Sequence, residues 1–423
     1  MSLPPTAASA ARDAALPLSG IRILDFSHVY QGPVGTQILA DYGADVIKVE
    51  RPGEGDWSRA WGPFVAGVSL PFANLNRNKR SITLNLKSNA GRMLIRRLAA
   101  AADVLVHNFR SGVMERLGLG YAEIAALNPR LIYASSSGWG DTGPHVDRRR
   151  GGHDMMARAE AGWFLRPDPN RAPIPGGISA DYPSGLMLMQ GILLALFHRE
   201  RTGRGQQVST DLYSVAFHAH AWEGAVELNA DRVDAPARVG GTEAAIDKAF
   251  LTADGAIEVS PVFSDNALRD ISTAMDLGDL SADARFATEA LQIRNREALN
   301  ALLAGQFATK ATAAWIEQLE PKGVLCARVQ SFIEASRDPQ IHANRMVVEM
   351  QHERAGSLKV LGTPIRLHGT PPVHDRPAPD LGEHTRDVLI ELGCEPGEIK
   401  QWIREGAAGQ HEIPSFTTKE TPS

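Results

Sequence analysis

The stretch ISADYPSG carries the residue with the most chemical content, Asp181, which has glycines at 176, 177 and 185 around it. A carboxylate at the start of a helix is stabilised by the positive end of the helix dipole, and nearby glycines let a bulky ligand approach the backbone. Such a carboxylate can attack an acyl thioester to form a mixed anhydride, which a thiolate then attacks in turn. Backbone amides close by can hold the developing oxyanion. On local grounds alone, however, a helix N-cap is the commoner role for this aspartate.

Other kinds of site have weaker support in the sequence. It contains no G-x-G-x-x-G after a strand, no phosphate-binding G-x-x-x-x-G-K loop, no G-x-S-x-G elbow and no H-E-x-x-H. A net charge of -5 gives no reason to expect a nucleic-acid or membrane partner. With only Cys326 and Cys394, no signal peptide and no apolar run long enough to span a bilayer, we expect a cytoplasmic protein.

The elements that must position Asp181 alternate between strand and helix. Strands are predicted over 21–26, 44–50, 81–86, 103–109 and 131–135, and helices over 33–42 and from Ser88 to about 101. This alternation predicts an α/β fold, a Rossmann-like parallel sheet with helices on both faces. Ligands of such sheets bind beyond the carboxyl ends of the strands, so the loops after Phe26, Glu50, Phe109 and Ser135 are the expected binding loops.

The remaining chain suggests further elements and a second domain. A buried helix is predicted over 185–199, then a turn at 202–205 and a strand over 206–213. We expect a large domain over 18–229 and 346–407 and a small α/β domain over 230–345. The small one should hold a hairpin turn at Asp254-Gly255 and helices near 291–307 and 312–320. The tail should end in a helix at 385–392, and residues 1–17 and 408–423 are expected to be disordered.

Eight segments in this order resemble family III of the CoA-transferases, which includes formyl-CoA transferase and the carnitine CoA-transferases. The resemblance covers about residues 18–393. The segments are GIRILDFSHVYQGP, ADVIKVERPGEGD, NRNKRSITLNL, HNFRSGVMERLGLGY, NPRLIYASSSGWGDTGP, the Asp181 loop, FHRERTGRGQQV and APDLGEHT.

The resemblance implies a mechanism and an assembly. The aspartate matching Asp181 carries the acyl group and then CoA as covalent intermediates, Asp154 would be a supporting carboxylate, and His153 would orient it or simply pack. Acyl-CoA and a small carboxylic acid would be the substrates, with no metal and no permanently bound cofactor. Family members are interlocked homodimers with the active site between the domains.

Five residues match family positions near CoA, and Tyr30 and Gln31 lie where the chain departs from the family pattern. His28, Asn108 and Phe109 match residues that line the CoA site, Arg51 one that contacts the nucleotide end, and Arg116 a phosphate ligand. Many relatives have Gln where this chain has Tyr30, and Gln31 follows, which puts the oxyanion contact assigned there in doubt. Positively charged Lys79, Arg80 and 148–150 add either local positive field or solvated surface. The glycine-rich shielding loop of formyl-CoA transferase has only 239–242 as a counterpart.

The α-methylacyl-CoA racemases of the same fold family offer a rival interpretation. They use a His and an Asp as a two-base pair, which here would be His153, in Gly-His-Asp, and Asp181. Two features count against it. Racemases follow the aspartate with a glycine-rich run, whereas here Tyr-Pro-Ser-Gly follows, and Phe263 falls where they have a supporting glutamate.

Overall fold

The computed structural model describes residues 16–165, 170–232, 245–246, 249–260 and 264–410. These residues form two units, which are described separately. One unit comprises the chain up to His220 together with the segment from Ala343 onward, and the other is Ala221–His342. The segments at 239–242 and 263, to which the sequence comparison gave roles in the small domain, lie outside the described residues.

A six-stranded, wholly parallel sheet forms the centre of the first unit, with the spatial order β10-β7-β6-β1-β2-β5. Its strands are β1 (Arg22–Asp25), β2 (Asp45–Glu50), β5 (Arg80–Thr83), β6 (Val104–His107), β7 (Ile132–Ser137) and β10 (Gln207–Asp211). Each strand overlaps a range predicted from the sequence, so the prediction of an α/β fold on a parallel sheet is confirmed. Three small antiparallel sheets belong to the same unit.

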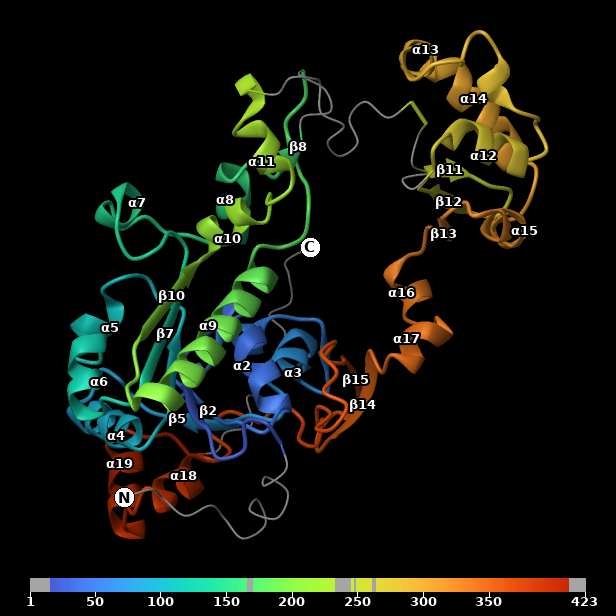
Figure 1. Ribbon diagram of the computed structural model, residues 1–423. Helices are drawn as coiled ribbons and strands as arrows, with labels where there is room; N and C mark the ends of the chain where they lie inside the picture. Colours follow the sequence, from blue (N-terminus) through green and yellow to red (C-terminus); the bar gives the residue numbers. More distant parts are fainter. Residues whose placement is uncertain (1–15, 166–169, 233–244, 247–248, 261–263, 411–423) are drawn as a thin grey trace, which may run out of the picture. The chain divides into compact units, whose positions relative to one another are not determined.

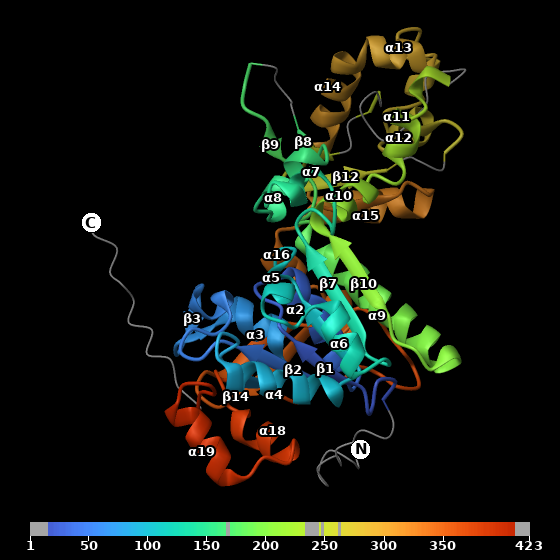
Figure 2. The same ribbon diagram turned by 90° about the vertical axis from the view of Figure 1, so that its left-hand side faces the viewer.

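Helices cover both faces of this sheet because successive strand residues point to opposite sides. Ile23 packs in a core with α2 (Gln31–Asp41) and α9 (Asp181–Thr202). Leu24, the next residue, packs in a second core with α4 (Asn89–Ala100) and α6 (Tyr121–Leu127). Figure 1 shows α2 and α9 on one side of the sheet and α4 and α6 on the other, and Figure 2 shows α9 running beside β7 and β10.

The predicted start is correct for α4 but not for α9. Ser88 is the N-cap of α4 as predicted, and its hydroxyl accepts a hydrogen bond from Gly91 N at 3.0 Å. Helix α9 begins at Asp181, four residues before the predicted start at Gly185. Pro183 does not prevent this, because the N–H groups of a first helical turn have no partner within the helix. Asp181 therefore lies inside the helix rather than in the loop before it.

The chain returns to the first unit after the second one and adds more structure than predicted. It forms a hairpin of β14 (Val347–His352) and β15 (Gly356–Leu361), followed by α18 (Thr385–Glu391) and α19 (Pro396–Arg404). The hairpin is hard to detect in the sequence because it buries few residues on a small core. Ala408 is buried and bridges Leu84, so the predicted disordered tail does not begin at 408.

Short elements complete the first unit, several of them in the loops at the carboxyl ends of the strands. They are η1 (Trp57–Ala60), β3 (Phe64–Val65), β4 (Val68–Ser69), α3 (Leu70–Asn76), α5 (Val113–Arg116), α7 (Pro144–Asp147), α8 (Asp154–Glu160), β8 (Phe164–Leu165), β9 (Ile174–Pro175) and α10 (Leu212–His218).

The second unit combines a three-stranded antiparallel sheet with several helices around a core that contains the fully buried Trp315. The predicted turn at Asp254-Gly255 joins β11 (Ala249–Leu251) to β12 (Ala256–Val259). The remaining elements from residue 221 to the return are α11 (Glu223–Glu227), η2 (Ala230–Arg232), α12 (Ala267–Ala274), η3 (Leu280–Ala282), α13 (Glu289–Arg294), α14 (Arg296–Phe307), α15 (Thr312–Leu319), η4 (Glu320–Lys322), β13 (Cys326–Arg328), α16 (Phe332–Ala335) and α17 (Pro339–Ala343). None of the helices in the described chain combines the length and the apolar character needed to cross a bilayer.

Candidate active site

The strand order reverses between β1 and β6. Ligands of open α/β sheets bind at such a reversal, so we expect the ligand crevice at the carboxyl ends of these two strands. Three of the predicted CoA-site residues, His28, Asn108 and Phe109, meet there. The Asn108 side chain, after β6, accepts a hydrogen bond from His28 N at 2.8 Å and donates one to His28 O at 2.9 Å. The Phe109 ring lies 5.6 Å from the His28 ring. The tertiary structure therefore brings together residues that are 80 positions apart in the chain.

His28 contributes a neutral ring to this crevice. Burial lowers the pKa of its imidazole, and the Lys48 ammonium lowers it further, against the opposing effect of Asp56. Its Nδ1 atom is buried and has no hydrogen-bond partner among the described residues; it lies 3.9 Å from an Asp56 carboxylate oxygen. At neutral pH this ring therefore offers a ligand an uncharged, half-buried surface.

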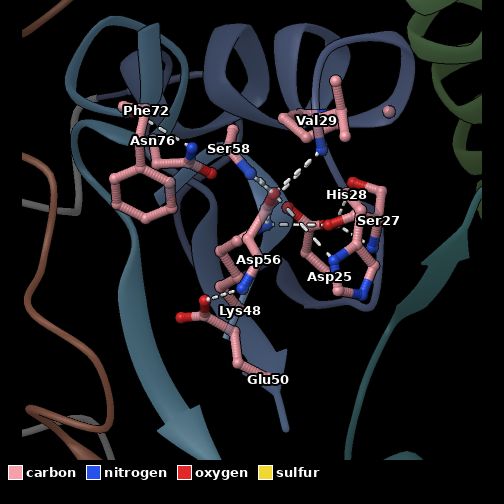
Figure 3. A network of polar contacts seen from close by, with 12 residues as sticks. Asp25, Ser27, His28, Val29, Lys48, Glu50, Asp56, Ser58, Phe72 and Asn76 are labelled. Atoms are coloured by element: carbon pink, nitrogen blue, oxygen red, sulfur yellow. Dashed lines mark hydrogen bonds and ion pairs between the residues drawn. The ribbon is translucent and has the colours of Figure 1, made fainter. Parts of the chain in front are cut away.

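The next residue, Val29, holds an uncommon backbone conformation. Its φ of 69° is in the left-handed region, which costs a β-branched residue ~1–3 kcal/mol. Val29 N donates to both carboxylate oxygens of Asp56, at 3.1 and 3.2 Å, as Figure 3 shows. Conformations of this kind persist where surrounding contacts enforce them and are concentrated at functional sites. The loop after β1 is thus fixed by contacts rather than by its own preference.

Asp181 is the first residue of α9, and its side chain does not cap the helix. The N-cap is Ala180, so the interpretation of Asp181 as an N-cap, favoured on local grounds, is wrong. Among the described residues, none donates a hydrogen bond to its carboxylate. Burial raises the pKa of Asp181 to about 6, and the neighbouring Asp154 carboxylate adds to the rise. A carboxylate that is partly desolvated and unpaired is more basic, and a better nucleophile, than an ordinary aspartate.

Asp154 holds the turn that leads into α9. One of its carboxylate oxygens accepts hydrogen bonds from the Ser179 hydroxyl, at 2.9 Å, and from Ala180 N. Its other oxygen pairs with Arg158 at 3.2 Å, and the Arg158 guanidinium also bonds the Gly176 and Gly177 carbonyls. Asp154 therefore places the Asp181 backbone and also raises the pKa of its carboxyl group.

Helices α2 and α9 approach closely where Asp181 begins α9, and glycines allow it. A Cβ atom added at Gly185 would lie 2.4 Å from Gln31 O and 2.2 Å from Val34 Cγ1. This contact brings Tyr30, the N-cap of α2, beside the start of α9. Burial raises the pKa of the Tyr30 phenol, and Tyr182, Asp181 and Asp154 raise it further.

Gln31 and Tyr30 lie in different surroundings. The Gln31 amide is buried and its Nε2 donates to Ser136 Oγ at 2.6 Å and to Ser137 O at 3.2 Å, so both of its N–H groups are used within the protein. Tyr30, in contrast, lies within electrostatic range of Asp181, whose carboxylate contributes to the raised pKa of the Tyr30 phenol. An oxyanion donor at this position would therefore be the Tyr30 hydroxyl rather than the Gln31 amide.

His153 is the N-cap of α8, and its ring nitrogen Nδ1 accepts a hydrogen bond from Met155 N at 3.2 Å. While this bond holds, the lone pair of Nδ1 is occupied and a neutral ring carries its proton on Nε2. The ring then presents a donor to the solvent rather than a basic nitrogen. The capping role accounts for the position of His153 without a catalytic one.

The basic residues predicted from the sequence fall into two groups. Both Arg51, on the loop after β2, and Arg116, the last residue of α5, are exposed, and Arg51 pairs with Glu54 at 2.7 Å. Lys79 and Arg80 are buried, so the expectation that they provide open positive field or a solvated surface is wrong. Lys79 pairs with Asp25 at 2.9 Å, and Arg80 with Asp45 at 2.7 Å.

Lys48 and Asp56 were not singled out from the sequence although both contact the loop after β1. One signal was available. Lys48 stands within the apolar strand VIKVE, and a charge inside a buried strand requires a partner. Asp56 supplies it at 2.8 Å.

Three comparisons with known proteins agree with this geometry. The family model described as CoA-transferase family III matches residues 18–385. An acyl-CoA transferase of Fusarium pseudograminearum (strain CS3096) is 39% identical over 406 residues, which cover 92% of this chain and 88% of that protein. The succinyl-CoA:glutarate CoA-transferase of Mus musculus is 34% identical, with 95% and 92% covered. The crystal structure of a CaiB/BaiF family protein from Brucella suis aligns with a TM-score of 0.78 at 34% identity, covering 89% of this chain and 100% of that one.

Proposed function

Since the chain belongs to family III of the CoA-transferases, and is an enzyme that moves CoA between an acyl-CoA and a carboxylic acid, we propose that the Asp181 carboxylate is its covalent carrier. The observation that carries this proposal is the state of that carboxylate. It lies at the start of α9 beside the crevice loop, receives no hydrogen bond from a described residue, and has a pKa raised to about 6.

The proposed reaction uses the same aspartate twice. Asp181 attacks the thioester carbonyl of the donor acyl-CoA, which forms a mixed anhydride and releases CoA thiolate. The thiolate attacks the Asp181 carbonyl, so that the donor acid leaves and an aspartyl-CoA thioester remains. The acceptor carboxylate then attacks this thioester and forms a new anhydride. The released thiolate attacks the acceptor acyl carbon, which yields the new acyl-CoA and restores the Asp181 carboxylate.

The neighbouring residues have supporting roles in this proposal. Asp154 and Arg158 hold the turn before α9, and the Tyr30 hydroxyl is the donor that we assign to the charge developing on the acyl oxygen. His28, Asn108 and Phe109 line the crevice for CoA, with Arg51 and Arg116 exposed at its outer loops to meet phosphates. The occupied Nδ1 of His153 favours this mechanism over a two-base racemisation by His153 and Asp181.

A dicarboxylic acid is the substrate class that we propose. Several relatives carry names that pair succinyl-CoA with a second dicarboxylic acid, namely glutarate, D-citramalate, L-malate or mesaconate. Others differ, as with the acetyl-CoA:oxalate CoA-transferase of Acetobacter aceti. Succinyl-CoA as donor and a short dicarboxylate as acceptor are therefore the first pair to test.

A covalent trap tests the carrier. The protein is incubated with succinyl-CoA, acetyl-CoA or a 2-methylacyl-CoA, quenched with hydroxylamine, and digested for peptide mass analysis. A hydroxamate on Asp181 is the expected product, because hydroxylamine attacks both the anhydride and the thioester. The Asp154→Asn protein serves as control and should still be labelled at Asp181. An unlabelled Asp181 together with exchange of the 2-methylacyl α-proton in heavy water would replace this proposal with the racemase.

The pH dependence of the reaction should reflect the raised pKa of Asp181. The carboxyl group attacks as the anion, so we expect kcat/KM to rise with pH through about 6 and to fall about tenfold per pH unit below it. Asp154→Asn removes the like charge but leaves an amide oxygen that can accept from Ser179 and Ala180. This variant should move the acid limb to lower pH, though not to the value of an ordinary aspartate, because burial is the larger cause. A limb that stays in place would argue against coupling of the two carboxylates.

We also propose that the enzyme works as the interlocked homodimer implied by its family resemblance. Apolar side chains on the outer side of α9 support a protein contact there, since Leu194 is 70% and Phe197 is 66% exposed. Light scattering of the purified protein distinguishes a dimer from a monomer.

A further inference from the structure

Several backbone N–H and C=O groups of Ser27, His28 and Val29 form hydrogen bonds with side chains of neighbouring elements. Ser27 N donates to Asp25 at 2.9 Å, and Ser27 O accepts from the Lys48 ammonium at 2.7 Å. Both backbone groups of His28 bond the Asn108 side chain, and Val29 N bonds Asp56. The shape of this loop is therefore imposed by Asn108, which bonds both backbone groups of His28, and by Lys48 and Asp56, which bond the residues before and after it. Figure 3 shows Lys48 and Asp56 beside Ser27, His28 and Val29.

Lys48 and Asp56 form a fully buried ion pair beneath the loop, with side chains 1% and 0% exposed. Burial opposes the charge on Lys48, but the carboxylates of Asp56, Asp25 and Glu50 outweigh it and hold its pKa above the ordinary value. Asp56 is anchored in turn, because it accepts from Ser58 N at 2.8 Å and its own N–H donates to Glu50. Each charge of the pair thus reaches the loop from a fixed position.

A buried ion pair is poor evidence for stability, since an apolar pair of similar volume often serves the fold as well. What an apolar pair cannot do is bond Ser27 O and Val29 N. These two bonds flank His28, and Val29 would not otherwise favour its left-handed conformation. The cost of burying the two charges is therefore explained if they serve the shape of the loop.

We propose that Lys48 and Asp56 are positioning residues that fix the loop Ser27–Val29 in its CoA-binding shape. They act through the backbone on either side of His28 and do not touch the ligand. The proposal rests on the proposed function in one respect, that CoA occupies the crevice between this loop and Asn108. A loop that is already in its bound shape loses less freedom on binding, so the pair should contribute to CoA affinity.

The test compares two buried ion pairs that are alike in exposure. The variant K48M/D56L removes both charges and keeps the volume. The control R77M/D41L does the same to the pair of Arg77 and Asp41, which are 1% and 0% exposed and bond no residue of the loop. Free CoA is titrated by calorimetry against the full-length proteins, and urea unfolding is measured for each. If K48M/D56L does not fold, Lys48→Met, which removes the bond to Ser27 O while Asp56 keeps its bonds to Ser58 N and Val29 N, replaces it.

We expect the Kd for CoA to rise at least about tenfold in K48M/D56L and to stay within about threefold of the wild type in R77M/D41L. In an Asn108→Ala background, where the loop is already released on one side, the same double substitution should add much less. Unchanged affinity in folded K48M/D56L, an equal rise in the control, or full additivity with Asn108→Ala would overturn the proposal. Hydroxamate on Asp181 in the wild type would leave the proposed function standing in each of these cases. A wild type that binds no CoA would end both.

Discussion

The Asp181→Asn variant should lose CoA transfer by about 10⁴-fold in kcat/KM, because the amide cannot form either covalent intermediate. The same substitution should leave CoA binding nearly intact, since the residues proposed to line the crevice are not changed. Transfer is measured by following the appearance of the acceptor's CoA ester, and CoA binding by calorimetry. A variant that keeps a tenth of the activity would rule out Asp181 as the obligatory carrier.

Asp181→Asn should also make the protein more stable at alkaline pH. Burial raises the folded-state pKa of Asp181 from 3.8 to about 6, so the folded protein holds this proton more tightly than the unfolded chain does. The contribution of the Asp181 carboxyl group to the free energy of unfolding therefore falls as the pH rises from about 4 to 6. Above pH 6 the ionised carboxylate destabilises the folded state. After allowance for its partial exposure, we expect the amide to add about 1–2 kcal/mol at pH 8.

Urea unfolding of the two proteins at pH 8 and at pH 3.5 measures this gain. Below the ordinary pKa the wild-type carboxyl is protonated in both states, so the difference should disappear. A loss of stability at pH 8 would show that the carboxylate has favourable partners in the folded protein and is not the unpaired group described here.

Gly185→Ala should disrupt the enzyme through packing alone. The new methyl group would lie 2.4 Å from the Gln31 carbonyl, which is backbone and cannot turn aside. The start of α9 must then move away from α2, and Asp181 moves with it. We expect the free energy of unfolding to fall by about 1–3 kcal/mol and kcat to fall by about 10²-fold, which is typical of overpacking and of a misplaced reactive group.

Gly191→Ala, on the same helix, is the matched control. Its methyl group would meet only Val208 Cγ1, at 2.6 Å, the end of a side chain that can adjust. Activity close to wild type is expected, because the start of α9 is unaffected. Equal losses in the two variants would mean that any alanine in α9 is harmful and that the contact between α2 and α9 is not special.

The sequence alone was sufficient to predict the fold class, the loops expected to bind a ligand and the family. The strand and helix periods predicted the parallel sheet, and the carboxyl ends of its strands indicated the loops after Phe26, Glu50, Phe109 and Ser135 as the places where a ligand would bind. The order of eight motifs identified the family, and the resemblance led to the prediction that Asp181 is the covalent carrier. These signals are local patterns or the order of motifs along the chain, so they can be recognised without knowledge of the tertiary structure.

Only the tertiary structure decided how those residues work together. His28 and Asn108 meet because β1 and β6 are neighbours in the sheet, which no local pattern specifies. On local grounds alone Asp181 resembled a helix N-cap, but Ala180 is the N-cap of α9, and no described residue donates a hydrogen bond to the Asp181 carboxylate. The sequence suggested that Lys79 and Arg80 are exposed charges, but both side chains are buried and pair with aspartates that are distant in the sequence. In each case the outcome depends on which distant groups a side chain can reach, and the packing of the sheet and helices determines this.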